Sequence, residues 1–139
     1  MTYKEAKHLK SAWVSRKKTD SKIPKPWGYE IVWSGFSGVH GKSLFIESGK
    51  RTSLKYNKMK SEVLMVKSGK VRAEYGDELT ISDPLVHPMQ TSILEPGDSL
   101  LVQSAAPYRI TAIEDSEIIE IGNNLSDSPV RLEDDYGRC

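Results

Sequence analysis

The chain has 139 residues and a mass of 15.6 kDa, which fits one domain, because a single hydrophobic core typically organises about 100–200 residues. Its 20 Lys and Arg nearly cancel its 19 Asp and Glu, so no whole-molecule field selects nucleic acid or an anionic membrane as a partner. The single cysteine, Cys139, is the last residue, which excludes an internal disulfide and a zinc site built from cysteines.

The sequence also lacks hydrophobic targeting and membrane signals. Its longest apolar runs, such as Leu100–Val102, fall far below the roughly 20 residues of a membrane span. The basic N-terminus lacks the apolar stretch of a signal peptide. We therefore expect a cytoplasmic protein with no membrane partner and no nucleic-acid partner.

The first 24 residues form a basic arm in which seven Lys and Arg face only two acidic residues. Leu9 and Trp13 recur at helical spacing, which permits one short amphipathic helix. A solvated or partner-packed arm is favoured over a nucleic-acid-binding one, because charge runs are usually solvated faces.

Two prolines, Pro24 and Pro26, lie where the arm ends and mark the entry into the folded body, because proline blocks a helix. We therefore predict a basic arm over residues 1–24 and one barrel with a C-terminal tail over residues 25–139.

From Gly28 onward the pattern is that of a β-protein. Short runs of β-branched, leucyl and aromatic residues alternate with Gly, Pro, Asn and Asp, as in strands joined by turns. No segment as far as Ser126 has ten residues of helical periodicity, so we predict an all-β antiparallel barrel or sandwich. Residues 77–91 are the least periodic and are predicted to form a long loop. The predicted strands are 29–33, 43–47, 62–67, 71–75, 99–103, 108–113 and 118–121.

The residues that point into a small β-barrel decide what it can hold, because alternate residues of each strand face inward. With that alternation, Lys55 and Asn57 share the interior with Glu62 and Tyr108. An amine, an amide, an acid and a phenol would then meet there. We take Glu62, Lys55 and Tyr108 as candidate catalytic residues and Asn57 as a candidate substrate-binding residue.

Three motifs resemble one branch of a known family. They are Lys25-Pro26-Trp27-Gly28-Tyr29-Glu30, the turns Ser68-Gly69 and Pro96-Gly97-Asp98, and the closing run from Val130 to Arg138. Over roughly Ile23 to Arg138 the chain resembles the cupin domain of type II phosphomannose isomerases, which also occurs fused to mannose-1-phosphate guanylyltransferase. The resemblance implies a jelly-roll barrel, or double-stranded β-helix, that binds a sugar phosphate and is often a homodimer.

The same resemblance implies that most of the family's metal ligands are replaced in this chain. The positions of the Gln and His ligands in the first family motif hold Lys55 and Asn57, the Glu ligand is kept as Glu62, and the His of the second motif is Tyr108. A lysine ammonium has no lone pair for a metal and repels it. We therefore predict no metal cofactor, although a weak divalent site of Glu62 with Asn57, Tyr108 and water stays open.

Without a metal, the Glu62 carboxylate needs another partner, because burying it unpaired costs several kcal/mol. We predict an internal ion pair between Lys55 and Glu62. The alternative is that Lys55 reaches out of the barrel mouth. The histidines match no family ligand position, so His8, His40 and His87 are predicted to be exposed in the arm or in loops.

The resemblance further implies three arginines as substrate-binding residues. The family's tail folds back toward the sugar-phosphate site, where Arg131 and Arg138 are the matching positions, and Arg109 follows the second motif. A guanidinium suits phosphate because of its planar fork. It is equally open that Arg131 and Arg138 pair with neighbouring acids and only clamp the tail.

Three functions follow as expectations. The first is a metal-free cupin of weak or no catalysis that binds a sugar phosphate or related small carbohydrate. The second is an active aldose–ketose isomerase of the mannose 6-phosphate type, with Glu62 as base and Lys55 as a fixed cation. The third is a dimeric interaction module built from the arm and the apolar strands.

Overall fold

The computed structural model describes residues 10–16, 21–123 and 128–139, and within them it contains eleven strands and no α-helix. Nothing in this part of the chain is therefore a helix that could cross a membrane. The strands are β1 (Ile23–Lys25), β2 (Gly28–Phe36), β3 (Val39–Ile46), β4 (Leu54–Tyr56), β5 (Glu62–Ser68), β6 (Val71–Tyr75), β7 (Gln90–Leu94), β8 (Ser99–Val102), β9 (Tyr108–Ala112), β10 (Ser116–Asn123) and β11 (Val130–Glu133).

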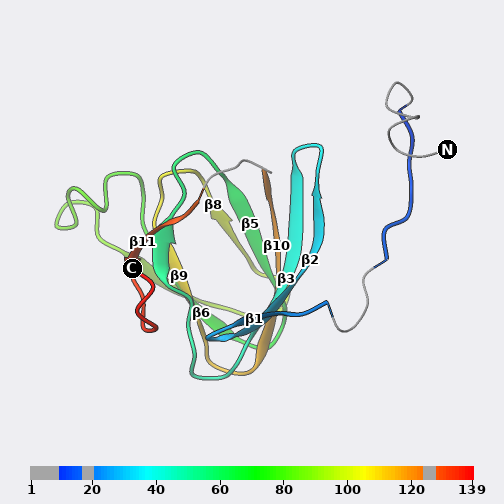
Figure 1. Ribbon diagram of the computed structural model, residues 1–139. Coiled ribbons are helices and arrows are strands. Elements are labelled where there is room, and N and C mark those ends of the chain that lie inside the picture. The colour runs from blue at the N-terminus through cyan, green and yellow to red at the C-terminus, as the bar shows by residue number, and fades with distance from the viewer. Residues whose placement is uncertain (1–9, 17–20, 124–127) are drawn as a thin grey trace.

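These strands form two antiparallel sheets that enclose one interior (Figure 1). The first sheet has six strands in the order β1-β2-β3-β10-β5-β8, and the second has five in the order β11-β4-β9-β6-β7. Neighbours come from distant parts of the chain, since β10 pairs with both β3 and β5. This arrangement is a jelly-roll barrel, which confirms the predicted all-β fold.

The seven predicted strands are all present, but four short strands, β1, β4, β7 and β11, are not among them. Runs of three to five residues carry too little alternation to stand out. The boundary of β3 also differs from the prediction, because the strand begins at Val39 rather than at residue 43. Gly38, which precedes the strand, has a positive φ of 79°, whereas Gly41 lies within the strand.

The arm does not contain the predicted helix in its described part. Residues 10–16 adopt no regular secondary structure, and Leu9 lies outside the described residues. Pairing with the sheet begins at Ile23, where β1 opposes β2. The ribbon of segment 10–16 lies outside the two sheets in Figure 1, and its Trp13 ring contacts that of Phe36 in β2 at 5.1 Å.

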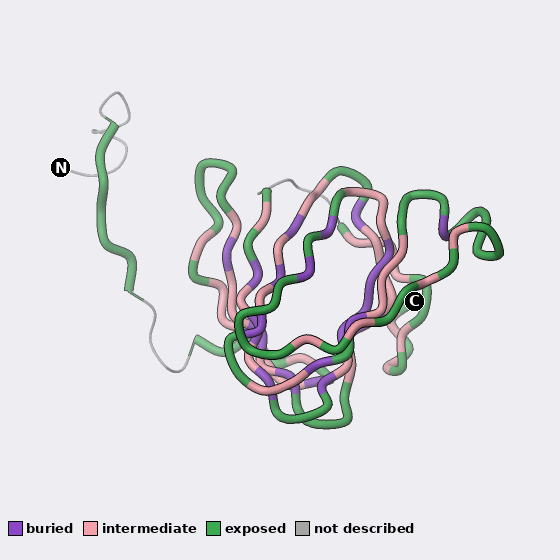
Figure 2. The backbone as a smooth tube through the Cα atoms, turned by 180° about the vertical axis from the view of Figure 1, so that it is seen from behind, coloured by how far each residue is buried: buried purple, intermediate pink, exposed green. Residues whose placement is uncertain are grey.

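Apolar side chains fill much of the barrel interior. Buried and exposed positions alternate along the strands, as the colours in Figure 2 show, because successive side chains point to opposite faces of a sheet. The core consists of Trp27, Leu44, Ile46, Leu64, Val66, Val71, Ala73, Leu100, Val102, Tyr108, Ile110, Ala112 and Ile118.

The segment between β6 and β7 is the predicted long loop, and its own hydrogen bonds order it. The Asp77 carboxylate accepts the Leu79 N–H at 2.8 Å and lies 2.9 Å from Nδ1 of His87. His87 is therefore a partner of Asp77 within the loop. Leu85 is 94% exposed in the same loop.

The turn between β5 and β6 depends on Gly69. Its φ of 90° lies in the left-handed region that a Cβ disfavours. A Cβ at this position would also lie 2.5 Å from the carbonyl oxygen of Asp115 and 2.8 Å from Cα of Ser116. Gly97 has a similar φ of 96°, but a Cβ there would meet no atom within 4 Å.

We expect Gly69→Ala to lower the free energy of unfolding more than Gly97→Ala does. The control Gly97→Ala adds only the cost of a left-handed backbone, about 1–2 kcal/mol, whereas Gly69→Ala also forces backbone atoms apart. Chemical denaturation of both variants measures the difference. Equal losses would contradict the close approach of the Gly69 turn to Asp115.

Candidate functional site

The barrel interior changes from apolar to charged toward one end. Along β10, the inward residue Ile118 is followed by Glu120, which lies opposite Lys42 of β3 and Leu64 of β5. Residues that oppose each other on paired strands point to the same face. The interior charge cluster, as we name it, consists of Glu30, His40, Lys42, Lys55, Asn57, Lys60, Glu62, Tyr108 and Glu120.

Glu62 lies in this cluster at the start of β5 and is 6% exposed. Nδ2 of Asn57 donates a hydrogen bond to its Oε1 at 2.7 Å, and the Tyr108 hydroxyl donates to its Oε2 at 3.0 Å. The structure thus brings together Glu62, Asn57 and Tyr108, which the sequence placed inside the barrel. Their catalytic and binding roles stay predictions.

The ammonium group beside Glu62 is that of Lys60. Its Nζ lies 3.6 Å from Oε1 of Glu62 and 3.9 Å from Oε2 of Glu120, so it bridges two carboxylates. Lys55 makes no such pair with Glu62 among the described residues, and the predicted Lys55–Glu62 ion pair is therefore wrong. Lys60 lies in the short link between β4 and β5, two residues before Glu62, and its ammonium reaches the Glu62 carboxylate.

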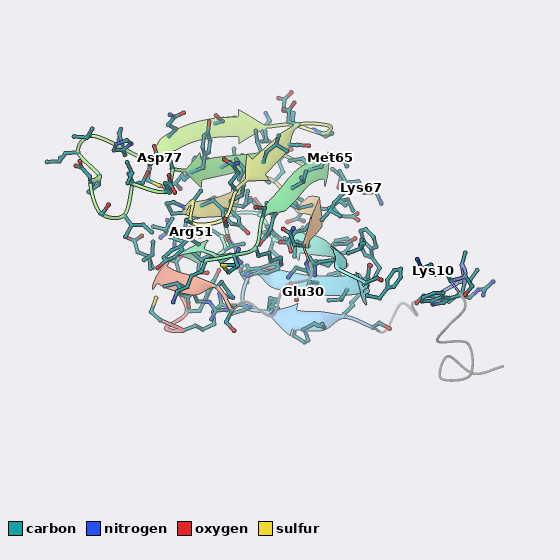
Figure 3. All side chains as sticks on the ribbon, turned by 90° about the horizontal axis from the view of Figure 1, so that it is seen from above. Lys10, Glu30, Arg51, Met65, Lys67 and Asp77 are labelled. Atoms are coloured by element: carbon teal, nitrogen blue, oxygen red, sulfur yellow. The ribbon has the colours of Figure 1, made fainter. Side chains whose placement is uncertain are left out.

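Sequence reasoning missed the other half of the cluster. Glu120 is 3% exposed, and its Oε2 lies 2.9 Å from Nε2 of His40 and 3.7 Å from Nζ of Lys42. Nζ of Lys42 also donates to Glu30 at 3.0 Å, a residue labelled in Figure 3. The prediction that His40 is exposed in a loop is wrong, since its side chain is 15% exposed within β3.

A signal for these residues was present in the sequence. His40 and Lys42 alternate with outward positions ahead of the core residues Leu44 and Ile46. Extending the period of two back from Ile46 and Leu44 would have placed the side chains of Lys42 and His40 on the inner face of the sheet.

The two neighbouring carboxyl groups differ in acidity. Burial opposes ionisation of Glu120, but the His40 hydrogen bond and the ammonium groups of Lys42, Lys55 and Lys60 outweigh it and lower its pKa to about 2. Burial and the Glu120 carboxylate raise the pKa of Glu62, against the effect of Lys60. Glu62 is therefore the member of the pair that takes up a proton more readily.

Lys55 lies between Tyr108 and a second cation, Arg131, and makes no ion pair with an acid within the described residues. It opposes Tyr108 of β9 on one side and Arg131 of β11 on the other, so the three side chains share the inner face. Its Nζ lies 5.8 Å from the centre of the Tyr108 ring. Burial lowers the pKa of Lys55, and the carboxylates of Glu120 and Glu62 offset this only in part.

Among the described residues, Arg131 has no ion pair of the kind that the other arginines of this region make. Its Nε is buried and makes no hydrogen bond within the described residues. By contrast, Arg51 pairs with Asp135 at 2.6 Å. In the part of the chain that the structure describes, Lys55 and Arg131 thus form a pair of adjacent cations with no ion pair to an acid.

The structure does not bring the other two predicted arginines into the cluster. Arg109 follows Tyr108 in β9 and so faces the opposite side of the sheet, where it donates to the carbonyl of Thr52 at 2.9 Å and lies 3.3 Å from the Glu133 carboxylate. Arg138 holds Asp134 through its backbone N–H at 2.7 Å and its Nε at 3.0 Å. Arg109 thus joins the barrel to the tail, whereas Arg138 is engaged within the tail, and their predicted substrate contacts stay untested.

The cluster does not fit a divalent metal ion of the kind that the family resemblance implies. Both oxygens of Glu62 already accept hydrogen bonds from Asn57 and Tyr108, and the neighbouring ammonium of Lys60 offers no lone pair. Within the described ranges, no group of three His, Cys, Asp or Glu side chains is arranged to hold a metal.

Comparisons with known proteins find similarity in structure only. No family model matches the sequence, and no curated protein matches it. Solved structures do match: KdgF from Halomonas sp. has a TM-score of 0.63 at 13% identity, covering 75% of this chain and 86% of KdgF.

Two longer proteins contain the same fold as part of their chains. The capsular polysaccharide assembling protein CapF from Staphylococcus aureus has a TM-score of 0.68 at 11% identity, with 81% of this chain and 31% of CapF covered. A vicilin from Solanum melongena has a TM-score of 0.63 at 17% identity, with 79% and 32% covered. This chain thus spans about a third of either protein. At these identities the likeness establishes the fold alone, and the chain has the cupin fold.

Proposed function

We propose that this protein binds a small anionic carbohydrate, such as a sugar phosphate, at the charged end of its barrel. The observation that carries the proposal is the pair of adjacent cations Lys55 and Arg131, with a buried Nε of Arg131 that has no hydrogen-bond partner in the described structure. An unsatisfied buried donor costs about 1–3 kcal/mol. An anion between the two cations would remove that cost.

The polar groups next to this cation pair suit the hydroxyl groups of a sugar. Tyr108 lies opposite Lys55, and Glu62 and Asn57 are hydrogen-bonded close by. Carboxylate, amide and phenol groups together can accept hydrogen bonds from vicinal hydroxyl groups and donate hydrogen bonds to them. The anionic group would bind at Arg131 and Lys55, and the uncharged part of the ligand at Glu62.

Two of the structural neighbours are consistent with this choice of ligand. The Solanum melongena vicilin is described as containing different anionic ligands in structurally similar pockets. CapF is described as assembling capsular polysaccharide. The shared fold supports an anion-binding barrel and a link to carbohydrates as part of the proposal.

The proposed binding function needs no resident metal. Lys42 and Lys60 would supply the positive charge that the buried carboxylates require. A metal at Glu62 would have to displace two hydrogen bonds and approach an ammonium at 3.6 Å, which Coulomb repulsion disfavours.

One observation favours isomerase activity as a second candidate. Glu62, with its raised pKa, is hydrogen-bonded to Tyr108 and lies beside the proposed anion site. In an aldose–ketose isomerisation, the ionised Glu62 would take the proton from the carbon next to the carbonyl and return it to the former carbonyl carbon, while the hydroxyl proton of the first carbon moves to the former carbonyl oxygen. Lys55 would stabilise the negative charge of the enediolate.

The anion site predicts a preference for the phosphorylated sugar. We expect mannose 6-phosphate to bind more tightly than mannose, and Arg131→Gln to weaken its binding by roughly 10- to 100-fold, since hydrogen bonds to charged groups contribute about 1.5–3 kcal/mol. Isothermal titration calorimetry measures both affinities. The matched control is Arg72→Gln at an exposed position of β6. Equal weakening by both substitutions would contradict the site.

The metal-free state predicts the response to added Zn²⁺, Co²⁺ or Mn²⁺. We expect the Tm of the purified protein to stay unchanged, because only a ligand that binds the folded state raises it. Differential scanning fluorimetry provides the measurement. A saturable rise in Tm that disappears in Glu62→Ala would show that the cluster holds a metal.

Isomerase activity has its own test. If the second candidate holds, the wild-type protein interconverts mannose 6-phosphate and fructose 6-phosphate, and Glu62→Gln abolishes the reaction while the sugar phosphate still binds. A coupled assay and calorimetry on the same variants separate catalysis from binding. Binding without interconversion in the wild type would eliminate the isomerase and leave the binding function.

A further inference from the structure

A cavity of about 440 Å³ lies between the arm and the hairpin formed by β2 and β3 (Figure 1). Its volume falls within the roughly 300–1,000 Å³ of small-molecule sites. Three aromatic rings and three serines line it, and the other described lining residues are small or aliphatic. The aromatic cavity, as we name it, has as its aromatic and serine residues Trp13, Trp33, Phe36, Ser11, Ser15 and Ser34.

A β-bulge in β2 determines which side of the sheet carries these rings. The register of β2 against β3 shifts between Val32 and Ser34, so Trp33 is the extra residue of the bulge. An extra residue reverses the alternation of the strand beyond it. Phe36 is consequently 53% exposed, whereas unbroken alternation from the buried Glu30 would point it into the barrel. The bulge thus places both rings on the outer side of the sheet.

The sheet also fixes the position of the Trp33 ring. Gly41 of β3 is buried, and a Cβ there would lie 2.5 Å from two atoms of this ring and 2.9 Å from a third. The six-membered part of the indole therefore lies against the backbone of β3, while Trp33 remains 41% exposed. A ring held in this way loses little conformational freedom when a ligand contacts it.

The arm supplies the opposite wall of the aromatic cavity. The Trp13 ring lies 5.1 Å from that of Phe36 in an edge contact with an interplanar angle of 61°. Residues 10–16 form no regular secondary structure, so this aromatic contact, rather than strand pairing, joins the arm to the hairpin. Both walls of the cavity come from one chain, which suits a small ligand and requires no partner subunit.

The lining favours a ligand that combines C–H groups with hydroxyl groups. The face of an aromatic ring carries partial negative charge, which attracts the C–H groups on the less polar side of a pyranose ring. A serine hydroxyl both donates and accepts hydrogen bonds, as the hydroxyl groups of a sugar require. The Ser34 hydroxyl donates to the carbonyl of Val39 at 2.9 Å, and its oxygen can accept a bond from a ligand.

The lining also favours a ligand without charge. None of the described lining residues is charged, so the cavity offers no ion pair to an anionic or a cationic ligand. Lys10 and Arg16, at the two ends of the described arm segment, are not among the lining residues. The cavity therefore differs in kind from the interior charge cluster.

We propose that the aromatic cavity is a second carbohydrate site, which binds a neutral saccharide with a pyranose ring against Trp33 and Trp13 and with hydroxyl groups on the serines. The proposed anion site at Lys55 and Arg131 belongs to the other sheet and points into the barrel. The two sites thus lie on different sides of the barrel wall, and ligand binding at one does not depend on the other.

Titration of the full chain with neutral oligosaccharides tests this site through tryptophan fluorescence, because two of the three tryptophans line the cavity. The probes are mannotetraose, maltotetraose and chitotetraose. We expect a saturable change in emission with at least one of them, at an affinity that added NaCl leaves unchanged. Trp33→Ala and Trp13→Ala should each raise the Kd about tenfold, an effect typical of truncating an aromatic anchor, and the remaining tryptophan reports it.

Gly41→Ala tests the position of the ring without removing it. Its methyl group displaces the Trp33 side chain rather than backbone, so the barrel should stay folded while the Kd rises severalfold. The matched control is Phe45→Ala, which removes a ring that stacks on Tyr29 of the same sheet and does not line the cavity. This control should leave the Kd unchanged.

Circular dichroism melts verify the folding of each variant. Trp13→Ala decides the result if Trp33→Ala does not fold, since the arm segment has no regular secondary structure. The absence of a saturable change with all three oligosaccharides would overturn the proposal. Equal weakening by Phe45→Ala, or an unchanged Kd in both Gly41→Ala and Trp13→Ala, would overturn it as well.

Discussion

The barrel depends on the compensation of buried negative charge by lysine. Glu30, Glu62 and Glu120 are each no more than 6% exposed, and a carboxylate buried without a partner costs several kcal/mol. Lys42 joins Glu30 to Glu120, and Lys60 joins Glu120 to Glu62. The two amines thus connect β2, β3, β10 and β5 through their side chains, and removing either one would leave a buried carboxylate short of positive charge.

This compensation also explains why the cation pair matters. Lys42 and Lys60 already form ion pairs with the buried glutamates. Lys55 and Arg131 therefore add positive charge that no described carboxylate neutralises by an ion pair. The cations that hold the fold together and those proposed to hold a ligand are therefore different residues. A barrel arranged in this way can stay folded without ligand and still attract an anion to one side of its interior.

The sequence predicted the fold well, since the turns at Gly69 and Gly97 and the alternation of the longer strands are local features. It also placed Asn57 and Tyr108 inside the barrel with Glu62. It could not predict which lysine reaches Glu62, because that depends on the path of the link between β4 and β5 rather than on spacing. Nor could it predict that Glu120 and His40 meet, since 80 residues separate them and their contact follows from the pairing of β10 with β3.

Anomalous X-ray diffraction from crystals grown with both Mn²⁺ and mannose 6-phosphate shows in one experiment whether amines replace a metal and whether Lys55 and Arg131 bind an anion. We expect phosphate density within hydrogen-bond distance of Nε of Arg131 and no manganese peak at Glu62. A manganese ion bound to Glu62, with Lys60 displaced and the phosphate elsewhere, would contradict this expectation.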